Sequence, residues 1–284
     1  MKVVVLGSSS SGNSTFVSIN NIKFLIDAGL PFGKLKDALY EIGENPEDLN
    51  FIIVTHAHSD HVKSLHSFNR VYNTKIYMSI EKFNEYNKKD YIKNYEFFDE
   101  MDNIMGIKFT KIPISHDKKG FGFVFEYDNK SLAYMTDTGM IHSRYHEKLK
   151  NKTIYLLESN HDVLMEMNGK KFEYIKYRNI GDEGHLSNED CAMYLNHFIG
   201  PNTKYIMLVH ISENDNTYEK AYEVNRESID SNIPIYIAYK DKISELIEVW
   251  YTFTKKYDII TIGGRIKLWR KRKIQKIQGM LHLF

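Results

Sequence analysis

The sequence contains one cysteine, Cys191, among 284 residues, so no disulfide can form within the chain. No stretch approaches the ~18 apolar residues that a membrane-spanning helix needs. The apolar run Val3–Leu6 is too short for the core of a signal peptide. These absences argue against a disulfide-rich secreted protein and against a helical membrane protein. We therefore expect a cytoplasmic protein.

Acidic residues are missing from the last twenty positions, 265–284, which hold seven lysines and arginines. The rest of the chain has 31 basic and 37 acidic residues, a balance of −6 that the overall charge of +1 conceals. The pattern predicts an acidic body with a basic C-terminal tail. No internal repeat or low-complexity linker divides the body.

Hydrophobic residues make up 42% of the chain, with 20 Tyr and 16 Phe, which is ample for a folded core. Short apolar runs bounded by turn residues predict strands. These runs are Val3–Leu6, Lys23–Ile26, Phe51–Val54, Ile107–Ile114, Gly122–Tyr127, Leu132–Thr136, Ile154–Leu157, Tyr205–Val209 and Ile233–Ala238. Apolar residues at helical spacing predict three helices. One ends at Gly43, one follows a capping box at Ser187, and one runs from Ile243 to Phe253. Strands mixed with helices favour an α/β sandwich with mixed sheets.

The strongest motif is H-x-H-x-D-H, formed by His56, His58, Asp60 and His61 directly after the apolar run Phe51–Val54. Imidazole and carboxylate groups suit Zn²⁺ or Mn²⁺, and a strand that ends in a tight turn can aim alternate side chains at one point. Four candidate ligands in one turn exceed what a single open tetrahedral site needs from one loop. The motif therefore predicts two divalent metal ions per chain.

Three more candidate ligands each follow a predicted strand: His116, Asp137 and His210. In open α/β sheets, functional groups gather at the carboxyl ends of strands, so these residues are expected at the same edge as the H-x-H-x-D-H turn. Any one of them alone is more often an ordinary loop residue. Together with the motif they complete a predicted set of seven ligands.

The order and spacing of these motifs resemble the metallo-β-lactamase superfamily, and within it the WalJ/YycJ-type exonuclease branch, which is kin to RNase Z-type endonucleases. The resemblance extends from residue 1 to about 240. It rests on Gly7–Ser14, Leu25–Gly29, Thr55–His61, Thr136–Gly139, Glu158–Asp162, Gly184–Asn188 and His210–Asn214. It implies a four-layer αβ/βα sandwich with a C-terminal helix and basic tail. The corresponding division is a catalytic domain at residues 1–240 and an extension at 241–284.

The resemblance also assigns roles to individual residues. It implies that His56, His58 and His116 hold one metal ion, that Asp60, His61 and His210 hold the other, and that Asp137 bridges them. It further implies that His185 donates a proton at the scissile phosphate and that Glu158 orients His185. His161 is expected either to touch the substrate or to cap its loop. Asp60 is a candidate for orienting the nucleophile.

Two further segments have competing interpretations. Gly7–Ser14 lacks the Gly-Lys-Ser/Thr ending of a P-loop, so a turn that packs beside the metal site is favoured over a nucleotide cradle. Tyr174–Arg178 offers Arg178 or Lys176 as a phosphate contact, although a solvated loop is equally compatible with it.

The leading functional hypothesis is a two-metal phosphodiester hydrolase that acts as a nuclease on nucleic acid. The alternative is a cyclic nucleotide phosphodiesterase of the anti-Pycsar type, which the acidic body favours mildly because a small substrate needs no basic groove. Another ester or thioester hydrolase is compatible with the fold alone. A non-catalytic nucleic-acid-binding protein is disfavoured because every expected ligand position is filled.

The basic tail also allows two interpretations. Trp269 lies between Lys267 and Arg270, so its ring could stack on a base while the cations neutralise phosphates. Alternatively, Ile266 and Leu268 could dock the segment on the body or on a second copy of the chain in a homodimer.

Overall fold

A computed structural model describes residues 1–229, 231–249, 257–262 and 265–270. Its contacts divide the chain into two compact units, Met1–Glu248 and Val249–Phe284. Within the described residues, no helix is long and apolar enough to cross a membrane. In the second unit, β15 (Tyr257–Ile262) pairs antiparallel with β16 (Arg265–Arg270). The remainder of the predicted basic tail, residues 271–284, lies outside the described residues.

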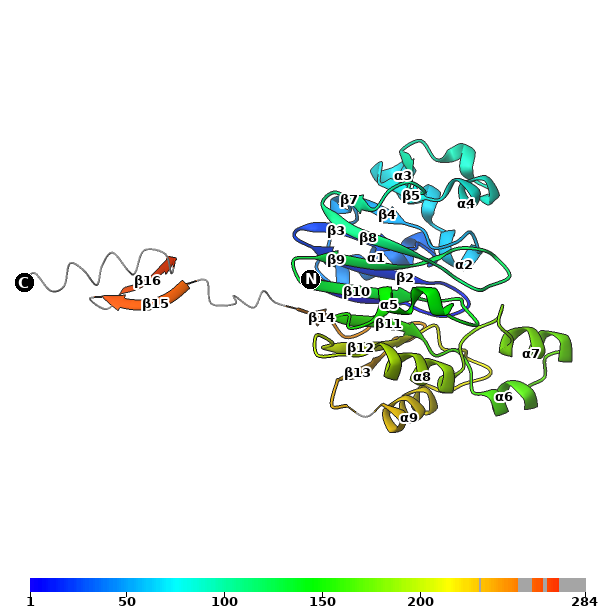
Figure 1. The fold of residues 1–284 in the computed structure, drawn as a ribbon. Helices are drawn as coiled ribbons and strands as arrows, with labels where there is room; N and C mark the ends of the chain where they lie inside the picture. Colours follow the sequence, from blue (N-terminus) through cyan, green and yellow to red (C-terminus); the bar gives the residue numbers. More distant parts are fainter. Residues whose placement is uncertain (230, 250–256, 263–264, 271–284) are drawn as a thin grey trace, which may run out of the picture. The chain divides into compact units, whose positions relative to one another are not determined.

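The first sheet of unit Met1–Glu248 has the strand order β14-β1-β2-β3-β4-β5-β6 (Figure 1). Strands β1, β2 and β3 pair antiparallel, and pairing from β3 through β6 is parallel. The strands are β1 (Lys2–Gly7), β2 (Ser14–Ile19), β3 (Ile22–Ile26), β4 (Phe51–Ile53), β5 (Lys75–Met78), β6 (Tyr95–Phe97) and β14 (Ile247–Glu248).

The second sheet has the order β13-β12-β11-β10-β9-β8-β7 and the same division into an antiparallel and a parallel half. Its strands are β7 (Asn103–Ile104), β8 (Ile107–Pro113), β9 (Phe121–Tyr127), β10 (Lys130–Met135), β11 (Ile154–Glu158), β12 (Tyr205–Val209) and β13 (Ile235–Ile237). The longer helices are α1 (Phe32–Glu41), α3 (Leu65–Tyr72), α7 (Glu173–Ile180), α8 (Asn188–Phe198) and α9 (Tyr218–Ser228). The shorter ones are α2 (Ser59–Val62), α4 (Ile80–Glu85), α5 (His146–Leu149) and α6 (Val163–Asn168).

Alternate residues of each strand face different layers, which produces the sandwich. Phe24 of β3 packs against Phe125 of β9 with ring centroids 5.2 Å apart, so these side chains fill the space between the sheets. The next residue, Leu25, instead joins a buried cluster with Leu35 and Leu39 of α1. Helices therefore cover the outer face of the first sheet, and the predicted αβ/βα layering is confirmed.

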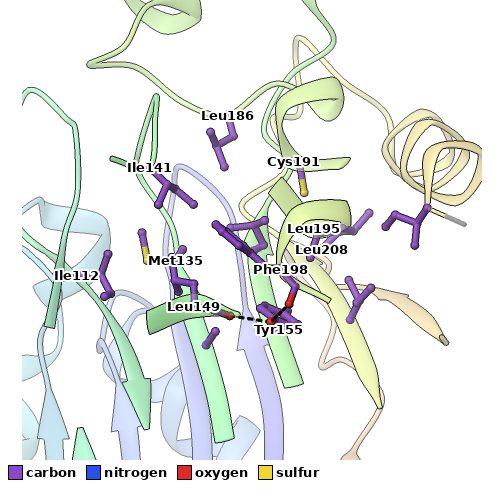
Figure 2. Packing of buried hydrophobic residues seen from close by; sticks show 14 of the residues in the cluster. Ile112, Met135, Ile141, Leu149, Tyr155, Leu186, Cys191, Leu195, Phe198 and Leu208 are labelled. Atoms are coloured by element: carbon purple, nitrogen blue, oxygen red, sulfur yellow. Dashed lines mark hydrogen bonds between the residues drawn. The ribbon is translucent and has the colours of Figure 1, made fainter. Parts of the chain in front are cut away.

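The outer face of the second sheet is buried in the same way (Figure 2). Tyr155 of β11 packs among Leu195 and Phe198 of α8. Its hydroxyl lies 2.7 Å from the Leu149 carbonyl oxygen and 2.9 Å from that of Phe198. This one side chain therefore places a polar partner beside the last carbonyl groups of two helices within an apolar layer.

The nine predicted strands and the helices before Gly43 and after Ser187 are confirmed, the latter with its capping box. The helix predicted from Ile243 is wrong in its described part. Ile247 belongs to β14, where it pairs with Val3, and the Ser244 amide donates to the Val5 carbonyl at 2.9 Å. Pairing with the open edge of β1 outweighs the helical spacing of the apolar residues, because it satisfies backbone groups on both segments.

Candidate metal centre

The seven predicted ligands converge on one edge of the sandwich. The H-x-H-x-D-H turn follows β4 of the first sheet, and the other three ligands follow β8, β10 and β12 of the second sheet. Their donor atoms form overlapping groups in which all atoms lie within 4.8 Å of one another. These groups are His56, His58 and His116; His56, His61 and Asp137; and Asp60, His61 and His210.

In the first group, His56 Nε2 lies 3.0 Å from His58 Nδ1. The His116 ring faces both rings edge-on, with centroids 5.7 Å from His56 and 5.2 Å from His58. Three imidazoles from two loops thus enclose one point, an arrangement suited to a cation with open coordination positions.

In the other two groups, which share His61, the Nε2 atom of His61 lies 3.3 Å from Asp60 Oδ2 and 3.2 Å from Asp137 Oδ2. The other Asp137 oxygen, Oδ1, lies 3.6 Å from His210 Nε2 and 3.9 Å from His116 Nε2. Asp137 therefore stands between His116 on one side and His61 and His210 on the other, in a position to share its carboxylate between two ions.

Three of the histidines are oriented through the nitrogen that faces away from the cluster. The Nδ1 atom of His61 lies 2.7 Å from Asp27, that of His210 lies 2.7 Å from Glu158, and that of His116 lies 3.2 Å from the Gly184 carbonyl. Donation from Nδ1 leaves Nε2 as the atom with a free lone pair, which is the usual state of a metal-binding histidine.

Two polar atoms in the cluster are buried without a hydrogen-bond partner among the described residues: Asp137 Oδ2 and His210 Nε2. Buried polar atoms without partners are costly, and here both face the enclosed points. A divalent cation would satisfy each of them. The residues present therefore fit the metal ions that the sequence predicts.

The cluster's electrostatics lead to the same conclusion. Burial alone raises the pKa of Asp137, but His210 and His61 hold its pKa well below the usual range. Conversely, burial lowers the pKa of His210, but Asp137 and Glu158 raise it to about 9. The ionised Asp137 carboxylate thus requires positive charge beside it. A divalent ion held by these residues would supply that charge.

A second buried carboxylate, Glu158, links two histidines. Its Oε1 accepts hydrogen bonds from Nδ1 of both His185 and His210, each at 2.7 Å, and its Oε2 accepts one from the Thr138 amide at 3.1 Å. Burial raises its pKa, but the two histidines hold the pKa of Glu158 at about 2. Glu158 therefore stays ionised and fixes both rings so that each Nε2 points away from it.

Comparison with known proteins agrees with this geometry. The family description "Metallo-beta-lactamase superfamily" matches residues 9–210. The exodeoxyribonuclease WalJ of Streptococcus pneumoniae serotype 2 is 36% identical over 229 residues, which cover 78% of this chain and 85% of WalJ. The exodeoxyribonuclease YycJ of Bacillus anthracis is 35% identical, covering 76% of this chain and 84% of YycJ. The chain belongs to the metallo-β-lactamase superfamily. It is accordingly a metal-dependent hydrolase.

Solved structures share the fold. YhfI from Bacillus subtilis, described as a metallo-beta-lactamase fold protein, superposes with a TM-score of 0.65 at 15% identity, covering 85% of this chain and 98% of YhfI. The short form of human tRNase Z superposes with a TM-score of 0.61 at 12% identity, covering 86% of this chain and 98% of tRNase Z. At these identities the likeness concerns the architecture alone.

Residues outside the seven candidate ligands hold the cluster in place. Asp27 accepts hydrogen bonds from His61 at 2.7 Å and from the amide and hydroxyl of Thr55 at 2.8 and 2.7 Å. Asn13 donates to Asp60 at 3.2 Å, and the Ser8 hydroxyl accepts from the His210 amide at 2.7 Å. The prediction that Gly7–Ser14 packs beside the metal site is therefore confirmed.

Close backbone contact explains one glycine in this region. A Cβ on Gly29 would lie 1.5 Å from the carbonyl oxygen of Asp60, so no other residue fits between the Leu25–Gly29 segment and the ligand turn. Asp27 itself has a φ of 62°, in the left-handed region that asparagine and aspartate tolerate best. Asp27 directly follows β3, just as His210 directly follows β12. The same strand-end position that pointed to His210 therefore also applies to Asp27.

We expect Asp27→Asn to weaken metal binding by about 10- to 100-fold, the usual effect of losing a carboxylate behind a ligating histidine. Asparagine keeps the shape and tolerates the backbone conformation, but its neutral amide no longer stabilises the Nδ1 proton of His61. Competition with a chelator measures the affinity. An unchanged metal affinity in a folded Asp27→Asn protein would remove this supporting role.

A cavity of about 430 Å³ opens onto the metal centre. It is lined by ligand side chains, by His185, and by Lys171, Ile175, Arg178 and Asn179 from the α6–α7 segment. Arg178 is thus part of a helix rather than a solvated loop, and its Nη1 lies 3.9 Å from Asp117. His161 does not line the cavity. Its side chain is 1% exposed, and its carbonyl oxygen accepts from the Asn188 amide at the start of α8.

Proposed function

We propose that this chain is a two-metal-dependent exodeoxyribonuclease. The observation that carries the proposal is the convergence of seven histidine and aspartate side chains from four strand ends, with three Nε2 atoms oriented inward by partners on Nδ1. Relatives at 35–36% identity, named exodeoxyribonucleases, support DNA as the substrate. All residues proposed for the site lie within unit Met1–Glu248.

The proposed ligand sets follow the groups described above. His56, His58 and His116 hold one ion, Asp60, His61 and His210 hold the other, and Asp137 bridges them. When bound, two such ions activate water and stabilise charge on the attacking and leaving oxygens of a phosphodiester. Zn²⁺ and Mn²⁺ both suit these nitrogen and oxygen donors.

His185 is the proposed proton donor. Glu158 holds its Nδ1, so Nε2 is left to face the cavity, and the side chain is 18% exposed there. As the phosphorus–oxygen bond breaks, this nitrogen gives its proton to the leaving oxygen. Asp60, which lies in the same cavity and is held by Asn13, is proposed to orient the attacking water.

A cyclic nucleotide phosphodiesterase is the second candidate, because a cavity of about 430 Å³ has the size of a small-ligand site. A substrate panel of single-stranded DNA, duplex DNA, RNA and 3′,5′-cyclic nucleotides, each with Mn²⁺ and with Zn²⁺, separates the two candidates. The proposal expects release of nucleotides from DNA. Rapid hydrolysis of a cyclic nucleotide with intact DNA would replace it with the second candidate.

The basic tail gives a separate prediction. Replacing Lys271, Arg272 and Lys273 by glutamine, which leaves the β15–β16 pairing sequence intact, should weaken DNA binding. The slope of the logarithm of the DNA-binding constant against the logarithm of the salt concentration should also become less steep, by about 0.9 for each phosphate that the tail no longer neutralises. Hydrolysis of bis(4-nitrophenyl) phosphate is the control and should not change. An unaltered salt slope would favour docking of the tail on the body or on a second subunit instead.

A further inference from the structure

The α6–α7 segment exposes an unusual concentration of apolar side chains. Among the described residues, fourteen large apolar side chains are exposed, and five of them fall between residues 164 and 177. Three are aromatic: Phe172, Tyr174 and Tyr177 are 73%, 70% and 62% exposed. Phe172 and Tyr174 lie nearly parallel, with ring centroids 6.0 Å apart. Exposed apolar patches of this kind mark binding surfaces.

The inner side of this segment is fixed by buried polar contacts. Lys171 Nζ lies 2.6 Å from Asp215 and 3.0 Å from Glu166, two carboxylates that are almost fully buried. Asn179 donates to the same Glu166 at 2.9 Å. Because these contacts anchor both helices, the aromatic rings on the outer side are presented by a rigid support, and little conformational entropy is lost when a ligand covers them.

The aromatic surface is continuous with the metal centre. Tyr174 and Arg178 are four residues apart on α7 and therefore share one face of the helix. Arg178 lines the cavity and contacts Asp117, whose other carboxylate oxygen lies 3.1 Å from His116 Nε2. Figure 1 shows α6 and α7 as a pair that projects from the sheets. A ligand on the rings can thus extend directly into the cavity.

The charge around the rings suits a phosphate backbone. Residues 170–178 include Lys170, Lys171, Lys176 and Arg178 against the single acid Glu173. Lys171 is neutralised by its two carboxylate partners, whereas the Lys176 ammonium group donates to the Met167 carbonyl oxygen at 2.7 Å and keeps its positive charge. Aromatic rings interleaved with cations form the usual surface for single-stranded nucleic acid, in which bases stack on the rings.

We infer that the outer face of α6–α7, defined by Phe172, Tyr174 and Tyr177 with Arg178, binds the single-stranded end of DNA and leads it to the metal centre. This inference rests on the proposed nuclease function and narrows its substrate. Paired bases cannot reach the rings, because their faces are already stacked within the duplex. The enzyme therefore favours single-stranded or frayed ends.

The test compares Tyr174→Ala/Tyr177→Ala with Tyr40→Ala/Tyr91→Ala, a control that removes two exposed tyrosines from α1 and from the turn at Lys89–Tyr91. Loss of two stacking rings should raise KM for single-stranded DNA by about 30-fold or more. The control variant, and Tyr174→Phe/Tyr177→Phe, which keeps both rings, should behave like the wild type. Hydrolysis of bis(4-nitrophenyl) phosphate should be unchanged in all variants, which shows that the metal centre is intact.

Three results would overturn the inference: an unchanged KM in the alanine variant, an equal rise in KM for the control variant, or conversion of a dimer to a monomer with KM unchanged. The last result would make this face an interface between two copies of the chain. If the wild type cleaves no DNA at all, the proposed function fails instead. Fluorescence anisotropy of a labelled oligothymidine then still reports whether the rings bind a single strand. Equal affinity in the wild type and in Tyr174→Ala/Tyr177→Ala would reject the inference.

Discussion

Asp137→Ala should lower the metal content of the purified chain and reduce DNA hydrolysis on the order of 10³-fold or more, which corresponds to about 4 kcal/mol of transition-state stabilisation. The reason is electrostatic. The Asp137 carboxylate is the group shared by the two proposed ligand sets, with one oxygen 3.2 Å from His61 and the other 3.6 Å from His210. Without it, two neighbouring cations repel each other with little compensation.

The matched variant for this prediction is Asp137→Asn. Asp137 has a φ of 55°, and asparagine tolerates this left-handed conformation better than alanine does, so it isolates the loss of charge from backbone strain. Both variants should contain fewer than two ions per chain by elemental analysis, with circular dichroism as the check on folding. Full occupancy of two ions in either folded variant would contradict the bridging role.

His185→Ala is expected to keep both ions and to lose about 10² to 10⁴ in the rate of DNA hydrolysis, the usual contribution of a general acid. His185 contacts Glu158 but belongs to neither ligand set proposed here, so its removal leaves the metal centre complete. The effect should be specific to poor leaving groups. Bis(4-nitrophenyl) phosphate releases a stable phenolate without a proton, so its hydrolysis should change by only a few fold.

Glu158→Gln makes a useful contrast, because Glu158 accepts from both His185 and His210 at 2.7 Å. This variant should impair the activated ester as well as DNA, since it disturbs a proposed ligand together with the proton donor. Equal losses on both substrates for His185→Ala would remove the proton-donor role and make His185 another support of the metal centre.

The convergence of the seven candidate ligands was predictable because its signal is local. His116, Asp137 and His210 each follow a short apolar strand closely, and parallel strands of one sheet end at a common edge. The H-x-H-x-D-H turn adds four more side chains within six residues. Strand position and residue type together thus predict which side chains meet at this edge before any contact is known.

The supporting contacts were not predictable in the same way. Asp27 follows β3 and shows the same pattern as the ligands, but its role depends on a hydrogen bond to His61, 34 residues away. In its described part, the helix expected from Ile243 is replaced by an edge strand in which Ile247 pairs with Val3 of the first strand. In both cases the deciding interaction joins distant segments, and sequence spacing does not encode it.

The α6–α7 surface was missed for a related reason. Tyr174–Arg178 was expected either to contact phosphate or to be a solvated loop, so its tyrosines were given no role. Their exposure follows from the opposite side of the segment, where Lys171 and Asn179 bind the buried carboxylate of Glu166. Which face of a short helix is buried depends on such anchors rather than on its average hydrophobicity.

The most direct test of the account is a titration of metal-free protein with Mn²⁺ or Zn²⁺ while DNA hydrolysis is followed. If the seven side chains form one centre for two ions, activity should be absent without metal and should saturate at about two ions per chain. Saturation at one ion, or full activity in the metal-free protein, would contradict a two-metal centre.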